Sequence, residues 1–194
     1  MYELFVGPPE LDAEWDDRGI DGVNRFLKRL WTLLMDSKDQ DIKATKEMIK
    51  LRHRMVYDIT NRLESFSLNT VISGFMEYNN KFIDVAKKEG GIDGETLETI
   101  AVLISPFAPH FAEEMWEQLG HEDTVFKAGW PTYDEDAMKD DEIEIPVQIN
   151  GKTKAVVSIS AEASKEDAIA AGKAAIADKL TGNVVKEIYV PKKI

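Results

Sequence analysis

The sequence contains no cysteine and only three histidines among its 194 residues. The absence of cysteine excludes disulfides, thiolate zinc sites and thiol nucleophiles. No run of about 18 apolar residues is present, and no basic N-terminal segment leads into an apolar stretch, so the sequence predicts neither a membrane span nor a signal peptide. We therefore expect a soluble, cytoplasmic protein with no membrane partner.

Motifs that carry chemistry are also missing. The sequence has no Walker loop, dinucleotide fingerprint, nucleophile elbow or zinc-protease helix. The glycine-rich residues 90–94 follow a predicted helix, which favours a helix stop over a phosphate cradle. His110, Glu113 and Glu114 have the spacing of a partial metal site, but too few further ligands are nearby, and a metal-dependent hydrolase is the weaker alternative. We expect no catalytic residue, metal or cofactor in this chain.

The charge is acidic overall and unevenly distributed. The sequence has 36 acidic and 24 basic residues, which give a net charge of -12. A net negative charge argues against a polyanionic partner. Residues 18–62 nevertheless carry eleven bases and six acids, and residues 146–194 carry eight bases and five acids, whereas residues 89–145 carry sixteen acids and two bases. The sequence thus predicts two mildly basic surfaces separated by an acidic belt.

Apolar residues recur at spacings of three and four in the first two thirds of the chain, which predicts a bundle of five amphipathic helices. Residues 1–17 lack such a period and are expected to be irregular. We expect Asp39 or Asp41 to cap the second helix, and Gly90 and Gly91 to end the third. The expected helices cover about residues 18–37, 42–63, 68–89, 97–104 and 111–119.

The last 50 residues have a different pattern. Residues 143–149 alternate apolar and polar side chains, Asn150 and Gly151 form a favoured hairpin turn, and a second strand follows. Ser164 and Asp167 resemble a capping box that opens an alanine-rich helix. Residues 184–190 are expected to form a third strand. The predicted fold class is therefore α+β, a helical bundle followed by a small ββαβ unit.

Basic residues form a stripe on the second predicted helix. At 100° per residue they lie opposite its apolar face, flanked by hydrogen-bonding and aromatic groups that suit RNA, although a merely solvated face is an equal alternative. Arg52 falls on the apolar side, where we expect a carboxylate partner rather than an RNA phosphate. The stripe consists of Lys43, Lys46, Lys50 and Arg54.

Five aromatic residues lie on the apolar faces of the predicted helices and are expected to belong to the core. Trp130 lies in the predicted linker and is expected to pack over the bundle rather than stack on a base. The aromatic residues assigned to the core are Trp31, Phe75, Phe82, Phe111 and Trp116.

Two segments carry a family resemblance. Residues 106–116 read PFAPHFAEEMW and residues 129–131 read GWP, which resembles the signature of the helical anticodon-binding domain of class I aminoacyl-tRNA synthetases. Residues 4–31, 67–72 and 145–191 contain passages similar to the bacterial leucyl-tRNA synthetases within that class. The resemblance covers essentially the whole chain.

This resemblance implies a parent enzyme that uses ATP and magnesium to attach leucine to tRNA-Leu, with editing of wrong amino acids elsewhere. The HIGH and KMSKS signatures are absent here, so we expect a C-terminal fragment that positions tRNA and has no active site. Its partners would be tRNA-Leu and the catalytic and editing domains of the same polypeptide, not DNA. The family usually continues with another short strand, so the tail is expected to be truncated.

Four parts are expected on this basis. Residues 1–17 would end the preceding catalytic region, residues 18–120 would form the anticodon-binding-like bundle, residues 121–142 an acidic linker, and residues 143–194 the C-terminal domain. A protein-interaction module that docks through its acidic surface is the alternative function.

Phosphate contacts from basic side chains are the expected mode of tRNA binding. The stripe residues are the first candidates, followed by His53 and Arg62. Asn69 matches a family motif or else caps its helix. The candidates in the tail are Lys152, Lys154, Lys192 and Lys193.

Overall fold

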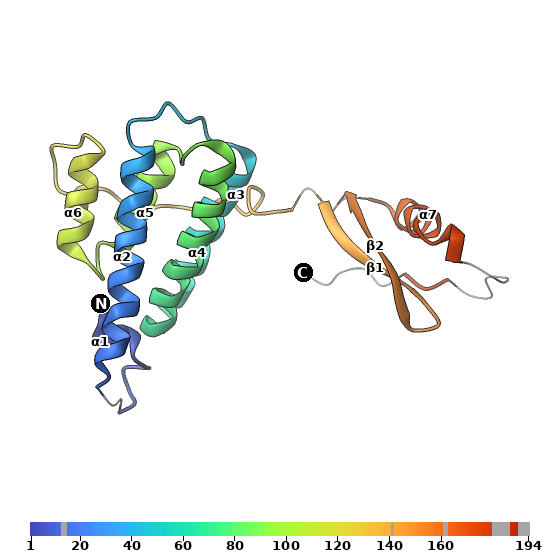
Figure 1. The fold of residues 1–194 in the computed structure, drawn as a ribbon, viewed down its shortest axis with the longest axis horizontal. Helices are drawn as coiled ribbons and strands as arrows, with labels where there is room; N and C mark the ends of the chain where they lie inside the picture. The colour runs from blue at the N-terminus through green and yellow to red at the C-terminus, as the bar shows by residue number, and fades with distance from the viewer. Residues whose placement is uncertain (13–14, 141, 161–162, 180–186, 190–194) are drawn as a thin grey trace. The chain divides into compact units, whose positions relative to one another are not determined.

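The computed structural model describes residues 1–12, 15–140, 142–160, 163–179 and 187–189. Contacts divide the chain into unit 1 (Met1–Met138) and unit 2 (Lys139–Ile194). Unit 1 is helical, whereas unit 2 contains a two-stranded antiparallel sheet and a helix (Figure 1). The fold class is α+β, as predicted.

Unit 1 contains the five predicted helices. Helix α4 packs against both α2 and α3, and α5 packs against α3 and α6. The elements are α1 (Tyr2–Phe5), α2 (Asp17–Ser37), α3 (Lys46–Glu64), α4 (Leu68–Glu89), α5 (Gly94–Ile104), α6 (Pro109–Gln118) and the 3-10 turn η1 (Val125–Lys127).

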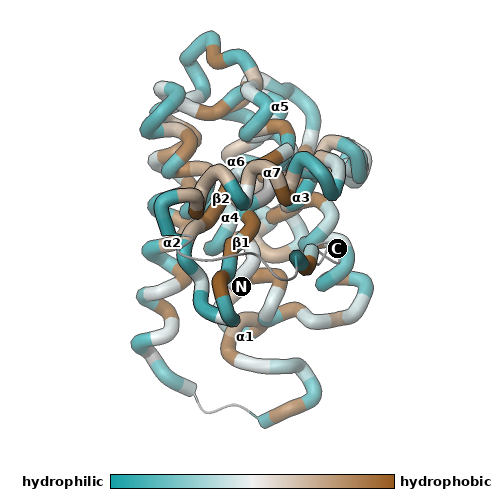
Figure 2. The backbone as a smooth tube through the Cα atoms, turned by 90° about the vertical axis from the view of Figure 1, so that its right-hand side faces the viewer, coloured by the Kyte–Doolittle hydropathy of each residue, from teal (hydrophilic) through white to brown (hydrophobic). Residues whose placement is uncertain are grey.

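One apolar core joins these helices. Each long helix carries both hydrophobic and hydrophilic residues (Figure 2), and the hydrophobic ones are buried between the helices. Phe75 and Phe82 are buried as predicted, while Trp31, Phe111 and Trp116 pack partly buried against the core. The shared core packs α2 and α3 against α4.

The start of α3 differs from the prediction. Thr45, not Asp39 or Asp41, is the cap, and its hydroxyl accepts a hydrogen bond from the Met48 N–H at 3.3 Å. Ile42 packs against the core from the loop before the helix, so its place in the helical period was coincidental. The predicted end of α4 is confirmed, because Gly90 adopts the left-handed conformation with φ 87°.

The N-terminal segment is not wholly irregular. The single turn α1 packs on α4 and α2, and the Tyr2 hydroxyl donates to the Asp16 carbonyl at 2.5 Å. The Tyr2 ring also meets Trp15 edge-on at 5.1 Å. Period counting misses such a turn because four residues are too few to show a helical repeat.

Unit 2 begins with the predicted hairpin. Strands β1 (Glu142–Ile149) and β2 (Lys152–Ser160) pair antiparallel, with Asn150 and Gly151 at positive φ in the turn. Ser164 caps α7 (Lys165–Ala175), as predicted, and η2 (Ala177–Lys179) follows. Of the predicted third strand, residues 187–189 are not in a strand, and residues 184–186 and 190 lie outside the described residues.

Candidate nucleic-acid interface

Residues 130–138, which we call the strap, contact the outer side of α3. The Trp130 indole N–H donates to the Thr60 hydroxyl at 3.0 Å, so this tryptophan packs over the bundle as predicted. Further along the strap, the Tyr133 ring meets Tyr57 edge-on at 5.1 Å. The strap therefore runs along α3 from the C-terminal part of the helix toward its middle.

Two candidate RNA-binding residues hold the other end of the strap. The Asp134 N–H donates to His53 Nδ1 at 3.1 Å, and Arg54 Nε donates to the Met138 carbonyl at 2.8 Å. Both side chains are partly buried. The polar groups of His53 and Arg54 therefore bind backbone of the same chain in this structure.

The rest of the predicted stripe is divided by the late start of α3. Lys43 is exposed in the loop before the helix and does not share its outer face with the other three. Lys46 is exposed in the first turn and Lys50 is partly buried. Both residues have an interaction partner. Lys46, Lys50 and Arg54 follow one another at intervals of four along the helix.

Arg52 points inward, as predicted. It is 7% exposed, and its guanidinium lies 3.2 Å from an Asp93 carboxylate oxygen and 3.0 Å from Glu95. Asp93 also caps α5 by accepting the Thr96 N–H at 3.1 Å. The expected carboxylate partner is confirmed, and Arg52 serves the junction of α3 and α5.

The remaining candidates of unit 1 lie where α3 meets α4. Arg62 donates to the Thr70 carbonyl at 2.6 Å and lies 3.9 Å from Glu77. Asn69 is partly buried in the first turn of α4, whose cap residue is Ser67, so the capping alternative for Asn69 is wrong.

A tyrosine also joins α3 and α4. The Tyr78 hydroxyl donates to the Asp58 carboxylate. Burial, and then this hydrogen bond, raise the pKa of Tyr78 well above its ordinary value. The pair is a structural contact, because Tyr78 is only 3% exposed and its hydroxyl is already bound to Asp58.

The candidates in unit 2 are partly described. Lys152 and Lys154 are exposed on β2. The Lys154 carbonyl accepts a hydrogen bond from the Lys179 ammonium at 2.8 Å, which leaves the Lys154 side chain itself exposed. Lys192 and Lys193 lie outside the described residues.

The residues of the partial metal motif do not form a common site. Glu113 accepts hydrogen bonds from the Thr124 hydroxyl and, at 3.2 Å, from the Val125 N–H, while His110 and Glu114 are exposed. Within the described ranges, no three histidine or carboxylate side chains are grouped to hold a metal ion. No helix in that part of the chain has the length and apolarity to cross a bilayer.

Three basic residues on the outer face of α2 were missed by the sequence analysis. Arg25, Lys28 and Arg29 are exposed, and within the described structure none of their side chains forms a hydrogen bond or ion pair. Their spacing of three and four residues places them on one helix face. That spacing is the signal in the sequence that could have identified them.

Comparison with known proteins identifies the domain. Residues 45–169 match the family described as the anticodon-binding domain of tRNA ligase. The chain belongs to this family. The matched residues of the anticodon-binding domain include all of α3 to α6, the strap and the hairpin of unit 2.

Two similar proteins carry the same name, leucine–tRNA ligase. The leucine–tRNA ligase of Fervidobacterium nodosum is 42% identical over 183 residues, which cover 86% of this chain and 22% of that protein. The leucine–tRNA ligase of Bacteroides thetaiotaomicron is 39% identical over 204 residues, covering 100% of this chain and 21% of that protein. The chain thus spans about a fifth of the length of these curated relatives.

A solved structure has the same fold. The chain resembles the Agrobacterium radiobacter K84 LeuRS, crystallised in a ternary complex with tRNA and LeuAMS, with a TM-score of 0.78 and 25% identity. The match covers 98% of this chain and 26% of that one. The anticodon-binding helices and the hairpin unit therefore occur together in a known synthetase.

Proposed function

We propose that this chain is the tRNA-binding part of a leucyl-tRNA synthetase, the ATP-dependent enzyme that attaches leucine to tRNA-Leu. The observation that carries the proposal is the anticodon-binding domain match over residues 45–169, together with the similarity to proteins named leucine–tRNA ligase. In this proposal the chain positions tRNA, and ATP and magnesium are bound by the catalytic part of the same polypeptide. The enzyme would act in the cytoplasm, alongside an editing domain.

The proposed architecture is a class I synthetase bundle over residues 18–120, a linker over residues 121–142 and a ββαβ domain over residues 143–194, with residues 1–17 leading from the catalytic region. The helices of unit 1 and the capped helix α7 on its hairpin support it.

Phosphate contact by basic side chains is the proposed mode of binding. Lys43, Lys152 and Lys154 support it best among the candidates, because they are exposed and their side chains form no hydrogen bond or ion pair within the described structure. His53, Arg54 and Arg62 bind groups of the protein itself and would have to exchange those partners for RNA. The other proposed contacts are Lys46, Lys50, Asn69, Lys192 and Lys193.

A titration tests the function. Labelled tRNA-Leu and a tRNA for an unrelated amino acid are titrated with the full chain at one stated low salt concentration, because salt weakens every phosphate contact. We expect measurable binding with a preference for tRNA-Leu. Equal affinity for both tRNAs would reduce the proposal to nonspecific polyanion binding, and no binding to either would refute it.

A further inference from the structure

We infer that the outer face of α2 is a phosphate-binding surface for tRNA, centred on Arg25, Lys28 and Arg29, which we call the α2 triad. The inference rests on the proposed function and adds which helix face binds the tRNA phosphates. It starts from the exposure of all three side chains and from the lack of any hydrogen bond or ion pair on them within the described structure.

The triad stands out by comparison with the other cations of unit 1. Apart from Lys43, every other lysine and arginine there has an interaction partner in the described structure, such as a carboxylate, a backbone carbonyl or an aromatic ring. A cation that has no protein partner breaks no protein interaction when it binds a phosphate, so its cost of binding is limited to lost hydration and side-chain freedom. The three residues of the α2 triad can therefore bind RNA without giving up a protein partner, which Lys43 alone shares among the described cations of unit 1.

The positions of the three side chains also suit a polyanion. Residues three and four apart on a helix are neighbours, with Cβ atoms about 5–6 Å apart, and no acidic residue lies between Arg25 and Arg29. The nearby Asp84 on α4 is bound by Lys87, which chiefly lowers the pKa of that carboxyl, and Arg29 contributes least to the shift. Asp84 therefore forms its ion pair with Lys87 and not with a residue of the triad.

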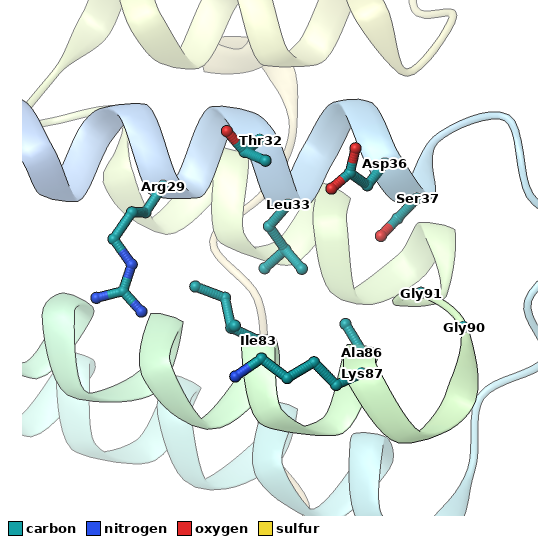
Figure 3. A pocket seen from close by; sticks show the side chains of 10 residues that line it. All are labelled: Arg29, Thr32, Leu33, Asp36, Ser37, Ile83, Ala86, Lys87, Gly90 and Gly91. Carbon is teal, nitrogen blue, oxygen red and sulfur yellow. The ribbon is translucent and has the colours of Figure 1, made fainter.

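A hollow between α2 and α4 adjoins the triad. Figure 3 shows Leu33 of α2 and Ile83 of α4 pointing toward one another across it, with the Arg29 side chain at one end, Asp36 toward the other end and Lys87 along α4. An apolar floor beside cationic side chains fits a nucleic acid strand, in which apolar sugar and base faces alternate with phosphates. Because the chain belongs to an anticodon-binding family, we assign the surface to RNA and make an acidic protein an outcome of the test.

The test compares two triple variants of the full chain. R25Q/K28Q/R29Q removes the triad, and R18Q/K88Q/K127Q removes three exposed cations that pair with Asp16, Glu47 and Asp123. Both variants lose the same net charge, so they differ only in which cations are removed. The affinity for a tRNA-Leu transcript is measured by fluorescence anisotropy over a series of salt concentrations, after circular dichroism has established that both variants fold.

Each phosphate contact contributes about 0.7–0.9 to the slope of log affinity against log salt. We expect the triad variant to lose about 2 to 3 from that slope and to bind at least tenfold more weakly at low salt, while the control variant keeps the native slope. Equal slopes in the native chain and the triad variant would overturn the inference, and so would an equal loss in both variants.

Two further outcomes separate this inference from others. If the native chain binds no tRNA at low salt, the proposed function fails and the inference fails with it. If the triad variant binds tRNA normally but no longer binds polyglutamate, the surface serves an acidic protein and only the inference is overturned.

Discussion

The outer faces of α2 and α3 carry basic residues at similar helical spacing, yet these residues do different work. On α3, Arg54 binds the strap backbone and neither Lys46 nor Lys50 lacks a partner. On α2, Arg25 and Arg29 are exposed with no hydrogen bond or ion pair in the described structure. The comparison teaches that spacing identifies a charged helix face, whereas the rest of the fold decides whether its charges are available.

The cause of the difference is the strap. It runs along α3, where Thr60 and Tyr57 supply a hydroxyl and an aromatic ring for it. The exposed side chains of the α2 triad form no bond with any described segment. Mutations on the outer face of α3 should therefore change mainly the stability of the fold, whereas mutations on the outer face of α2 should change mainly the affinity for RNA.

The largest effect is expected from the inward side of α3. Arg52→Met leaves Asp93 buried at 4% exposure without its guanidinium partner, and we expect it to lower the free energy of unfolding by about 3–5 kcal/mol. Urea unfolding followed by tryptophan fluorescence measures this loss in unit 1, which contains all four tryptophans.

A second variant controls for the buried charge. Arg52→Met with Asp93→Asn removes the unpaired carboxylate and keeps a side chain that caps helices well, so it should recover most of the loss. Equal stability of the single and double variants would show that the buried ion pair is not what holds α3 to α5.

The next effect tests how α3 is held to α4. Tyr78→Phe removes the hydrogen bond to the Asp58 carboxylate, and we expect a loss of about 1.5–3 kcal/mol in the free energy of unfolding at neutral pH. The raised pKa of folded Tyr78 means that its contribution is complete below about pH 10, the ordinary tyrosine value, and is lost as pH rises above it.

The stability difference between native chain and Tyr78→Phe should therefore narrow in alkaline urea titrations. Tyr57→Phe is the matched control, because Tyr57 is 39% exposed and contacts the strap through its ring rather than its hydroxyl. A gap that stays constant between neutral and alkaline pH would contradict the assigned role of Tyr78.

The sequence predicted helices α2 to α6 of unit 1 and the partner of Arg52 correctly. It predicted the start of α3 incorrectly, for a physical reason. The helical period identified α2 to α6, and the inward place of Arg52 required a carboxylate partner. The start of α3 was wrong because Asp41 and Thr45 are both good caps, and the choice between them depends on Ile42 packing into the core. Local pattern cannot contain that tertiary contact.

The same limit explains the candidate site. The sequence predicted a basic face on α3, but nothing local to Arg54 indicates that a carbonyl 84 residues later will bind it. The exposed triad on α2 has the same spacing signal as the stripe on α3. Choosing between the two faces requires knowing where the strap runs, which is a property of the folded chain.

A smaller effect is expected when the strap loses its anchor. Arg54→Ala removes the bond to the Met138 carbonyl, at a cost of about 0.5–1.5 kcal/mol. Hydrogen exchange followed by mass spectrometry should show faster exchange in residues 130–138, with little change in α2. Arg25→Ala is the control, and comparable exchange of the strap in both variants would contradict the anchoring role.

The smallest effect on stability is expected from the α2 triad itself. Arg25 and Arg29 are like charges four residues apart, an arrangement that destabilises a helix by about 0.2–0.5 kcal/mol, and their exposed side chains hold no bond that folding requires. R25Q/K28Q/R29Q should therefore unfold at slightly higher urea than the native chain at low salt. The gain should shrink as salt rises, because exposed charges are screened. A loss above about 1 kcal/mol, far outside the usual range for exposed positions, would mean that these cations stabilise the fold, and α2 would then resemble α3 after all.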